Sequence, residues 1–395
     1  MVQTQSRVGV GLICLALGFI IGRWLQPPAR ATTTTTTTTA TPETARAAPI
    51  ERDDNNERTK HRAMRRNEVH WDVPPPASAQ ATAASAWASA KAVWGYESPL
   101  SDLEMLSSDP RVRSAFATLP RGLIAWNMDA QLKLWRGTLQ PLAKEAMARS
   151  PLRTSTMYPP LDIAVLWAFV RSVRPRQIIE IGAGSSTTVI AAALAANAED
   201  DERGVPASHM NAGAPPPRSR RALCDAAAMI AGSRPAAAAA AAGVACHVCV
   251  EPFRTAAVIE RSVVVVPRRV QTLPLTLFDT LGPGDILFID SSHVLQPYGD
   301  TIYELLWILP RLPIGTLVHV HDIFLPDDYP ASWTEGGARQ YTEQYMLAAL
   351  LSGSQDWEVI FATRLLMTTH HELFTDIDMS EEEINGGSLW LRKVK

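Results

Sequence analysis

A short apolar segment that leads into a glycine turn and then into a helical pattern constrains this chain more than any other feature. Gln177–Ile181 (Gln-Ile-Ile-Glu-Ile) predicts a buried strand, and the Gly-Ala-Gly turn of residues 182–184 follows it directly. Residues 185–196 predict a helix whose first turn offers three hydroxyl caps, Ser185, Ser186 and Thr187. A strand, a tight turn and a helix in this order open a parallel α/β unit.

Six more apolar segments continue the pattern toward the C-terminus. They are residues 246–250, 263–266, 285–289, 316–320, 357–362 and 388–394. Helical patterns cover residues 161–173, 298–309 and 338–351. Seven strands with interleaved helices predict an α/β fold with a doubly wound, Rossmann-like sheet, preceded by a helical extension from about residue 96.

The interval between the first two strands is too long for a simple strand–helix–strand unit. The second acidic strand end, Glu251, comes far later than the roughly 20 residues that usually follow the glycine turn. Residues 197–243 supply the surplus, with a triple proline and a run of alanines. We expect this segment to be a low-complexity surface insertion that cofactor binding does not require.

The N-terminal residues predict a separate membrane-directed region. Val8–Gly22 contains no charge and lies between Arg7 and Arg23, so residues 1–27 are predicted to form a single-pass signal-anchor helix in an endomembrane such as the Golgi. A cleaved signal that ends at Ala29-Arg30-Ala31, and a secreted or organellar product, is the alternative. Residues 28–95, with their threonine run, predict a low-complexity stalk, and residues 96–395 the folded domain.

The charge balance and the number of cysteines argue against some classes of binding partner and of site. The 37 basic and 40 acidic residues give a net charge of −3, so no overall positive field favours nucleic acid. Four cysteines are too few for a disulfide scaffold. Cys246 and Cys249 share one predicted strand and point to opposite faces, which favours core cysteines over a zinc site.

The glycine turn and Glu251 together predict a nucleoside cofactor. Glycines let a ligand approach the backbone, and a carboxylate at the end of the next strand can accept both ribose hydroxyls. Thr187 stands where a dinucleotide fingerprint has its third glycine, which disfavours an NAD-dependent oxidoreductase. The pattern therefore favours a cofactor without a pyrophosphate.

Residues 157–394 resemble the class I S-adenosylmethionine-dependent methyltransferases. Glu180–Thr187 is similar to their first motif, and Glu251-Pro252 to the acidic end of their second strand. The resemblance implies the strand order 3-2-1-4-5-7-6 and S-adenosylmethionine as cofactor. It also implies that the cofactor-binding residues are Glu180, Gly182, Gly184, Ser185, Ser186, Thr187, Glu251 and Asp290.

Three further segments resemble a subgroup that methylates small molecules or sugars. These segments are residues 288–293, 321–324 and 343–345. The resemblance implies methyl transfer to an oxygen or nitrogen of a small-molecule or sugar acceptor. A non-catalytic protein that keeps the fold and binds the cofactor is the competing hypothesis, and the oligomeric state stays open.

Four polar residues follow neighbouring predicted strands, where they can meet at one pocket. As catalytic residues we expect Asp290, His293 and His321, with a histidine as general base. Alternatively, Asp290, His321 and Asp322 could bind a divalent metal, as carboxylates do in catechol-type methyltransferases. Those enzymes carry Asp-Asn where this chain has His321-Asp322, which favours the histidine base. Residues 291–293 could also simply cap the following helix.

Overall fold

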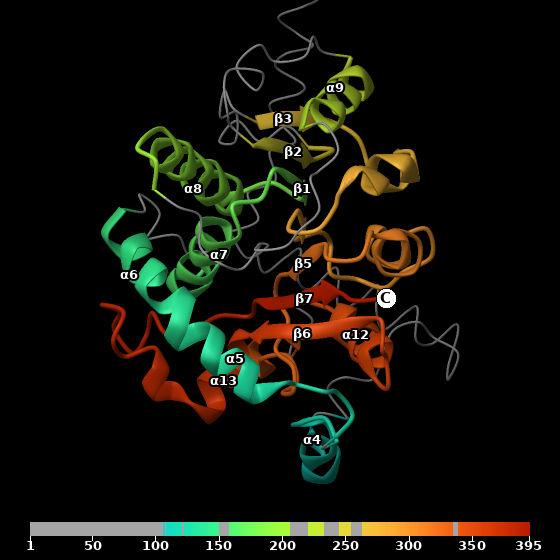
Figure 1. Cartoon of the computed structure of the whole chain (residues 1–395). Coiled ribbons are helices and arrows are strands. Elements are labelled where there is room, and N and C mark those ends of the chain that lie inside the picture. Colours follow the sequence, from blue (N-terminus) through green and yellow to red (C-terminus); the bar gives the residue numbers. More distant parts are fainter. Residues whose placement is uncertain are drawn as a thin grey trace, which may run out of the picture. The chain divides into compact units, whose positions relative to one another are not determined.

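Seven strands form one mixed sheet in the order β3-β2-β1-β4-β5-β7-β6, which confirms the predicted order (Figure 1). In this computed structural model, strands β1 to β5 are parallel, and β7 pairs antiparallel with both β5 and β6. The strands are β1 (Gln177–Ile181), β2 (Cys246–Val250), β3 (Val263–Val266), β4 (Ile286–Ile289), β5 (Leu317–Val320), β6 (Trp357–Ala362) and β7 (Leu389–Lys393).

The structure describes residues 106, 108–120, 122–149, 158–205, 220–232, 245–253, 263–334 and 339–395. The predicted anchor (residues 1–27) and stalk (residues 28–95) lie outside these residues. Within them, no helix is both long and apolar enough to span a membrane.

Helices pack on both faces of the sheet. One face carries α6 (Gln140–Arg149), α7 (Pro160–Val173) and α8 (Ser185–Glu202), and the other carries α9 (Arg220–Ala231) and α12 (Glu343–Leu351) (Figure 1). The predicted helical extension contains α4 (Pro110–Phe116), α5 (Met128–Leu134) and the π-helical turn η3 (Trp135–Leu139). Short helices complete the chain: η5 (Val270–Thr272), η6 (Leu275–Thr280), α10 (Asp300–Tyr303), η7 (Glu304–Ile308), η8 (Leu309–Arg311), α11 (Ala331–Thr334), α13 (Thr363–Thr369) and η10 (His371–Leu373).

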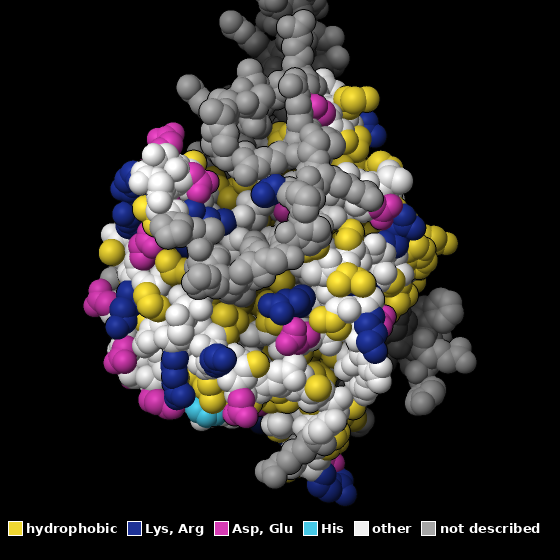
Figure 2. All heavy atoms as spheres, in the orientation of Figure 1, with side chains coloured by type: hydrophobic (Ala, Val, Ile, Leu, Met, Phe, Trp, Pro, Cys, Tyr) yellow, Lys and Arg dark blue, Asp and Glu magenta, His cyan; other side chains and the backbone are white. Residues whose placement is uncertain are grey.

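Burial explains why the central elements are so apolar. Every residue of β1 is buried, as expected for a parallel strand covered on both faces. Helix α7 is buried from Leu161 to Val173 because it lies between the sheet and its neighbours α6 and α8. At the surface, by contrast, Lys and Arg side chains are separated by acidic, apolar and uncharged ones on the face seen in Figure 2.

Two predicted helices begin later than the apolar pattern suggested. Tyr298 has φ 62, a left-handed conformation that helices exclude, so α10 begins only after Gly299. Thr342 has φ −136, so α12 begins at Glu343 rather than near residue 338.

The prediction that residues 197–243 form a surface insertion is wrong for the parts that the structure describes, while their dispensability for cofactor binding stays a prediction. Residues 197–202 belong to α8, and α9 lies within the same segment. Leu223, Ala227 and Ala228 of α9 are fully buried in the core beside β2 and β3. A helix that fills the core on this face stabilises the sheet.

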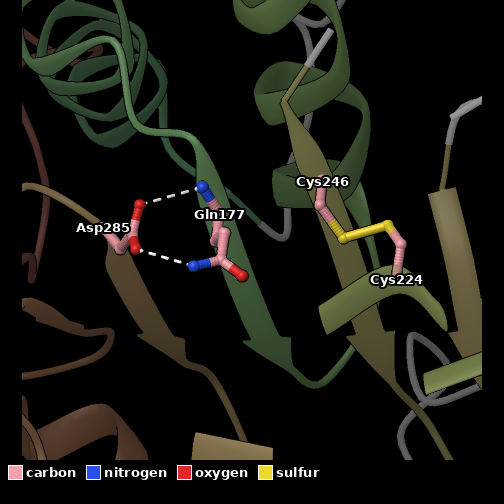
Figure 3. The surroundings of a disulfide bond; sticks show 4 residues. All are labelled: Gln177, Cys224, Cys246 and Asp285. Carbon is pink, nitrogen blue, oxygen red and sulfur yellow. Dashed lines mark hydrogen bonds between the residues drawn. A yellow bond between two sulfur atoms is a disulfide. The ribbon is translucent and has the colours of Figure 1, made fainter. Parts of the chain in front are cut away.

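A disulfide bond joins α9 to the sheet. Cys224 of α9 and Cys246 of β2 are bonded, with their Cα atoms 5.9 Å apart (Figure 3). At the neighbouring start of β1, Asp285 accepts hydrogen bonds from the backbone and side-chain nitrogens of Gln177. Cys246 and Cys249 are both buried, as expected for core cysteines, and Cys249 is not part of a disulfide.

Loss of this disulfide should destabilise the domain. Its cysteines are 22 positions apart, and closing a loop of that size contributes about 3 kcal/mol to the free energy of unfolding. Denaturant unfolding of Cys224→Ser should show a loss of that order, and reductant should produce a similar loss in the wild type. Cys249→Ala is the control, since it should keep the response to reductant. Equal stability of oxidised and reduced wild type would contradict the expectation.

Candidate functional site

The glycine turn after β1 brings three strand ends together. Gly182 has φ +94, and a Cβ atom there would lie 2.0 Å from the backbone oxygen of Asp290 at the end of β4. Its N–H donates to the oxygen of Val250 at the end of β2, at 3.0 Å. A Cβ added to Gly184 would meet no atom within 4 Å, so the backbone is open there. The turn therefore packs tightly against β4 and leaves open space at its second glycine.

Glu180, the acidic residue of the first motif, stabilises this turn through buried contacts. Glu180 is fully buried, and its Oε1 accepts hydrogen bonds from Ser186 Oγ at 2.7 Å and Thr187 Oγ1 at 3.0 Å. Its Oε2 lies 2.8 Å from Nε2 of His247 on β2. Three of the residues predicted to bind cofactor thus direct their side chains to one another, and Ser185 begins α8 directly after Gly184.

Glu251 lies where the ribose hypothesis requires a carboxylate. It follows β2, and its Oε1 accepts a hydrogen bond from the backbone nitrogen of Phe253 at 2.6 Å. Burial raises the pKa of the Glu251 carboxyl, while backbone hydrogen bonds from Phe253 and Ala183 lower it. Val250, the residue before Glu251, accepts the hydrogen bond from the backbone nitrogen of Gly182, so Glu251 directly follows the contact between β2 and the glycine turn.

Asp290 lies between two histidines on the opposite side of the turn. Its Oδ1 is 3.2 Å from Nε2 of His293 and 3.4 Å from Nδ1 of His321. Asp322, after β5, places Oδ1 3.7 Å from that same nitrogen of His321. The four residues predicted for catalysis or metal binding therefore form one cluster at the ends of β4 and β5.

Only the carboxylates of this cluster reach the surface. The Asp290 side chain is 29% exposed and that of Asp322 is 15% exposed, against 5% for His293 and 3% for His321. An acceptor molecule that enters the site can therefore touch the carboxylates more readily than the imidazoles.

Two further carboxylates contact the histidines from the side away from Asp290, and neither was predicted from the sequence as a site residue. Oε2 of Glu343, the first residue of α12, lies 2.9 Å from Nδ1 of His293. Asp162 of α7 places Oδ2 3.4 Å from Nε2 of His321, and it accepts hydrogen bonds from Ser388 Oγ and Gly387 N. Each is an acidic residue in the first turn of an otherwise apolar helix, which is the signal that could have revealed them.

The electrostatics of the cluster follow from this alternation of acids and histidines. Burial alone would lower the pKa of His293, but hydrogen bonds to Asp290 and Glu343 outweigh it and raise the pKa to about 10. Burial likewise opposes protonation of His321, yet the charges of Asp322 and Asp290 hold its pKa well above the usual value. Burial disfavours ionisation of Asp290, but His321 and His293 bring its pKa far below the ordinary range. The cluster holds ionised Asp290 between two imidazolium rings.

Asp290, His321 and Asp322, the residues of the metal alternative, lie close together: Nδ1 of His321 is 3.4 Å from Asp290 Oδ1 and 3.7 Å from Asp322 Oδ1. Among the residues that the structure describes, no group of three or more His, Cys, Asp or Glu side chains could hold a metal ion.

Comparison with known proteins bears on the chemistry of this site. Residues 179–323 match a family model described as a methyltransferase domain. No curated protein matches the chain. Among solved structures, the chain is similar to the Podospora anserina methyltransferase PaMTH1 bound to SAH, with 13% identity and a TM-score of 0.31 over 75% of this chain and 98% of that one. The family match spans the glycine turn, Glu251 and the Asp290–Asp322 cluster.

Proposed function

We propose that this chain is a class I S-adenosylmethionine-dependent methyltransferase that methylates an oxygen or nitrogen of a small-molecule or sugar acceptor. The observation that supports this most strongly is the convergence of two sites on one glycine turn. Val250, the residue before Glu251, contacts the turn at Gly182, and the backbone of Asp290 lies against the same glycine. A cofactor over the first site would lie beside the acid–base cluster of the second.

The open backbone at Gly184 and the Glu251 carboxylate would hold the cofactor. A carboxylate at the end of β2 can accept hydrogen bonds from both ribose hydroxyls, as in other nucleoside-binding sheets. S-adenosylmethionine, when bound, supplies an electrophilic methyl group on a sulfonium. Ligands of open α/β sheets bind where the strand order reverses, which in this sheet is between β1 and β4.

The cluster would remove the proton that the acceptor loses. As the new O–CH₃ or N–CH₃ bond forms and the S–CH₃ bond breaks, S-adenosylhomocysteine leaves and the acceptor proton passes to a carboxylate. Asp290 is the best-placed recipient because it is ionised and is the most exposed member of the cluster, and since its low pKa makes it a weak base, it passes the proton on to water. This assignment replaces the histidine base favoured by the sequence, because both ring nitrogens of each histidine already face a carboxylate.

His293 and His321 would then act as positioning residues. Their positive charges fix the orientation of the Asp290 carboxylate and offset the charge of its neighbours. Glu343 and Asp162 hold the two rings in turn, at 2.9 Å and 3.4 Å. Such a preorganised site contributes mainly by aligning the acceptor for in-line displacement.

Methyl transfer to a mixed acceptor pool tests the proposal. The full chain should transfer label from methyl-labelled S-adenosylmethionine to components of a pooled extract of sugars, phenols and small amines. EDTA should leave the rate unchanged, because the cluster works by proton transfer without a metal. Loss of activity in EDTA with recovery in Mg²⁺ would restore the metal hypothesis. Binding of the cofactor with no transfer to any fraction would favour the non-catalytic alternative.

We also propose that the domain lies on the lumenal side of an endomembrane, tethered by residues 1–27. The uncharged run Val8–Gly22 supports the anchor, and the Cys224–Cys246 disulfide supports an oxidising compartment. Protease treatment of intact membrane vesicles should leave the domain uncut until detergent is added. Digestion of the domain in intact vesicles would contradict a lumenal location.

A further inference from the structure

We propose that Arg339, stacked on Trp333 and Tyr341, forms a subsite for a carboxylate group of the acceptor. The inference rests on the proposed methyl transfer and narrows its substrate to acidic molecules. It is carried by a set of aromatic rings beside the catalytic cluster, by a guanidinium that has no acidic partner among the described residues, and by an unsatisfied amide on the next residue of the chain.

Aromatic rings line the segment between β5 and α12. The ring centroids of Trp333 and Tyr341 are 5.5 Å apart, and Tyr329 lies 6.0 Å from Tyr341. Phe324 packs edge-on against Trp333 at 5.1 Å. These four rings, here called the aromatic wall, pack edge to face, and its two partly exposed members, Trp333 and Tyr341, can contact a small aromatic or sugar ring.

This aromatic wall adjoins the catalytic cluster directly. The centroid of the Tyr341 ring is 4.4 Å from that of His293. Burial raises the pKa of Tyr341 to about 12, and the negative charges of Asp322 and Asp290 add to that rise. The Tyr341 hydroxyl therefore lies within electrostatic range of both carboxylates. An acceptor against Tyr341 would therefore place a hydroxyl or amine within reach of Asp290.

The Arg339 guanidinium stacks on two rings of the aromatic wall. Its Cζ lies 4.2 Å from the Trp333 centroid and 5.7 Å from that of Tyr341. The backbone nitrogen of Arg339 also donates to the Trp333 oxygen at 2.8 Å, which fixes the position of the chain there. Stacking holds the guanidinium plane by its face and leaves its N–H edges for hydrogen bonding.

The N–H groups of the Arg339 guanidinium have no acidic partner within the described part of the chain. None of the ion pairs or side-chain hydrogen bonds of those residues involves the Arg339 guanidinium. The adjacent Gln340 has a buried side-chain nitrogen, Nε2, that has no hydrogen-bond acceptor among the same residues. Two neighbouring residues thus have unmet donors, which calls for a ligand rich in acceptor oxygens.

A carboxylate fits these donors best. A planar guanidinium binds a carboxylate through two parallel hydrogen bonds, and a neighbouring amide can add a third. The site is otherwise rich in carboxylates, namely Asp290, Asp322 and Glu343, so an anionic group is tolerated only beside Arg339. The acceptor would therefore carry its acidic group at Arg339 and the reacting hydroxyl or amine at Asp290.

Calorimetric titration with matched probes tests this subsite. The full chain, saturated with S-adenosylhomocysteine, would be titrated with 3,4-dihydroxybenzoate against catechol and with galacturonate against galactose. We expect the acidic member of at least one pair to bind at least tenfold tighter than its neutral counterpart. Arg339→Gln should remove that preference while S-adenosylhomocysteine binds as in the wild type. Arg311→Gln, at a surface pair with Asp279, is the control and should keep it.

Two results would overturn the subsite even if the methyltransferase proposal stands. One is an equal affinity, or no binding, for both members of both pairs in a chain that binds S-adenosylhomocysteine. The other is an acidic preference that persists in Arg339→Gln. Failure of the wild type to bind S-adenosylhomocysteine would instead refute the proposed function, and with it this inference.

Discussion

Gly182→Ala should abolish cofactor binding and lower the free energy of unfolding by about 2–5 kcal/mol. The φ of +94 disfavours any side chain, and the new Cβ would lie 2.0 Å from the backbone oxygen of Asp290. Backbone cannot move aside as a flexible side chain can, so β1 and β4 would have to separate at their ends. Denaturant unfolding and titration with S-adenosylhomocysteine measure the two effects.

Variants at two other glycines distinguish the effect of a positive φ from the effect of the steric clash. Gly353 also has a positive φ, +66, but a Cβ there meets no atom within 4 Å, so Gly353→Ala should cost only about 1 kcal/mol. Gly184→Ala lacks both the positive φ and the clash, and it should reduce cofactor affinity with little loss of stability. Wild-type stability and affinity in Gly182→Ala would show that the turn does not pack as described.

Asp290→Asn should reduce kcat for methyl transfer by about 10²- to 10⁴-fold, the usual contribution of a general base. Asparagine has nearly the same shape but cannot take the acceptor proton. Because the backbone of Asp290 stays against Gly182, binding of S-adenosylhomocysteine should change much less than kcat. The measurement is the rate of label transfer at saturating cofactor, alongside a titration with S-adenosylhomocysteine.

Asp279→Asn is the matched control, since Asp279 is a surface carboxylate paired with Arg311. It should keep the wild-type rate. His321→Gln should lower kcat less than Asp290→Asn does, because His321 acts through Asp290. A His321→Gln variant that loses all activity while Asp290→Asn keeps it would return the base role to the histidine.

Much of the fold follows from local patterns in the sequence. β1, β2 and β3 have the predicted bounds, because buried parallel strands are apolar runs between charged or glycine-containing turns, and so does the antiparallel edge strand β6. Helix α9 was missed because low-complexity composition surrounds an amphipathic stretch whose buried Leu223 and Ala227 are four residues apart. The Cys224–Cys246 bond could not be predicted either, since it depends on where α9 packs.

The sequence predicts where the site lies in the fold, but it predicts less well in which direction each side chain points. Strand ends placed Glu251 and Asp290 correctly, because parallel strands present their carboxyl ends at one edge. The family resemblance implied that Glu180 binds the cofactor, whereas its side chain points inward to Ser186, Thr187 and His247. Glu343 comes from an element far along the chain, so spacing alone did not connect it to His293.

Titration of the full chain with S-adenosylhomocysteine, beside NAD, tests the central claim most directly. We predict that S-adenosylhomocysteine binds and NAD does not. Glu251→Ala should weaken binding by about 2–3 kcal/mol, or roughly 30- to 150-fold, because it removes charge-assisted hydrogen bonds to the ribose. Binding of NAD alone, or an unchanged affinity for S-adenosylhomocysteine in Glu251→Ala, would contradict the assigned cofactor site.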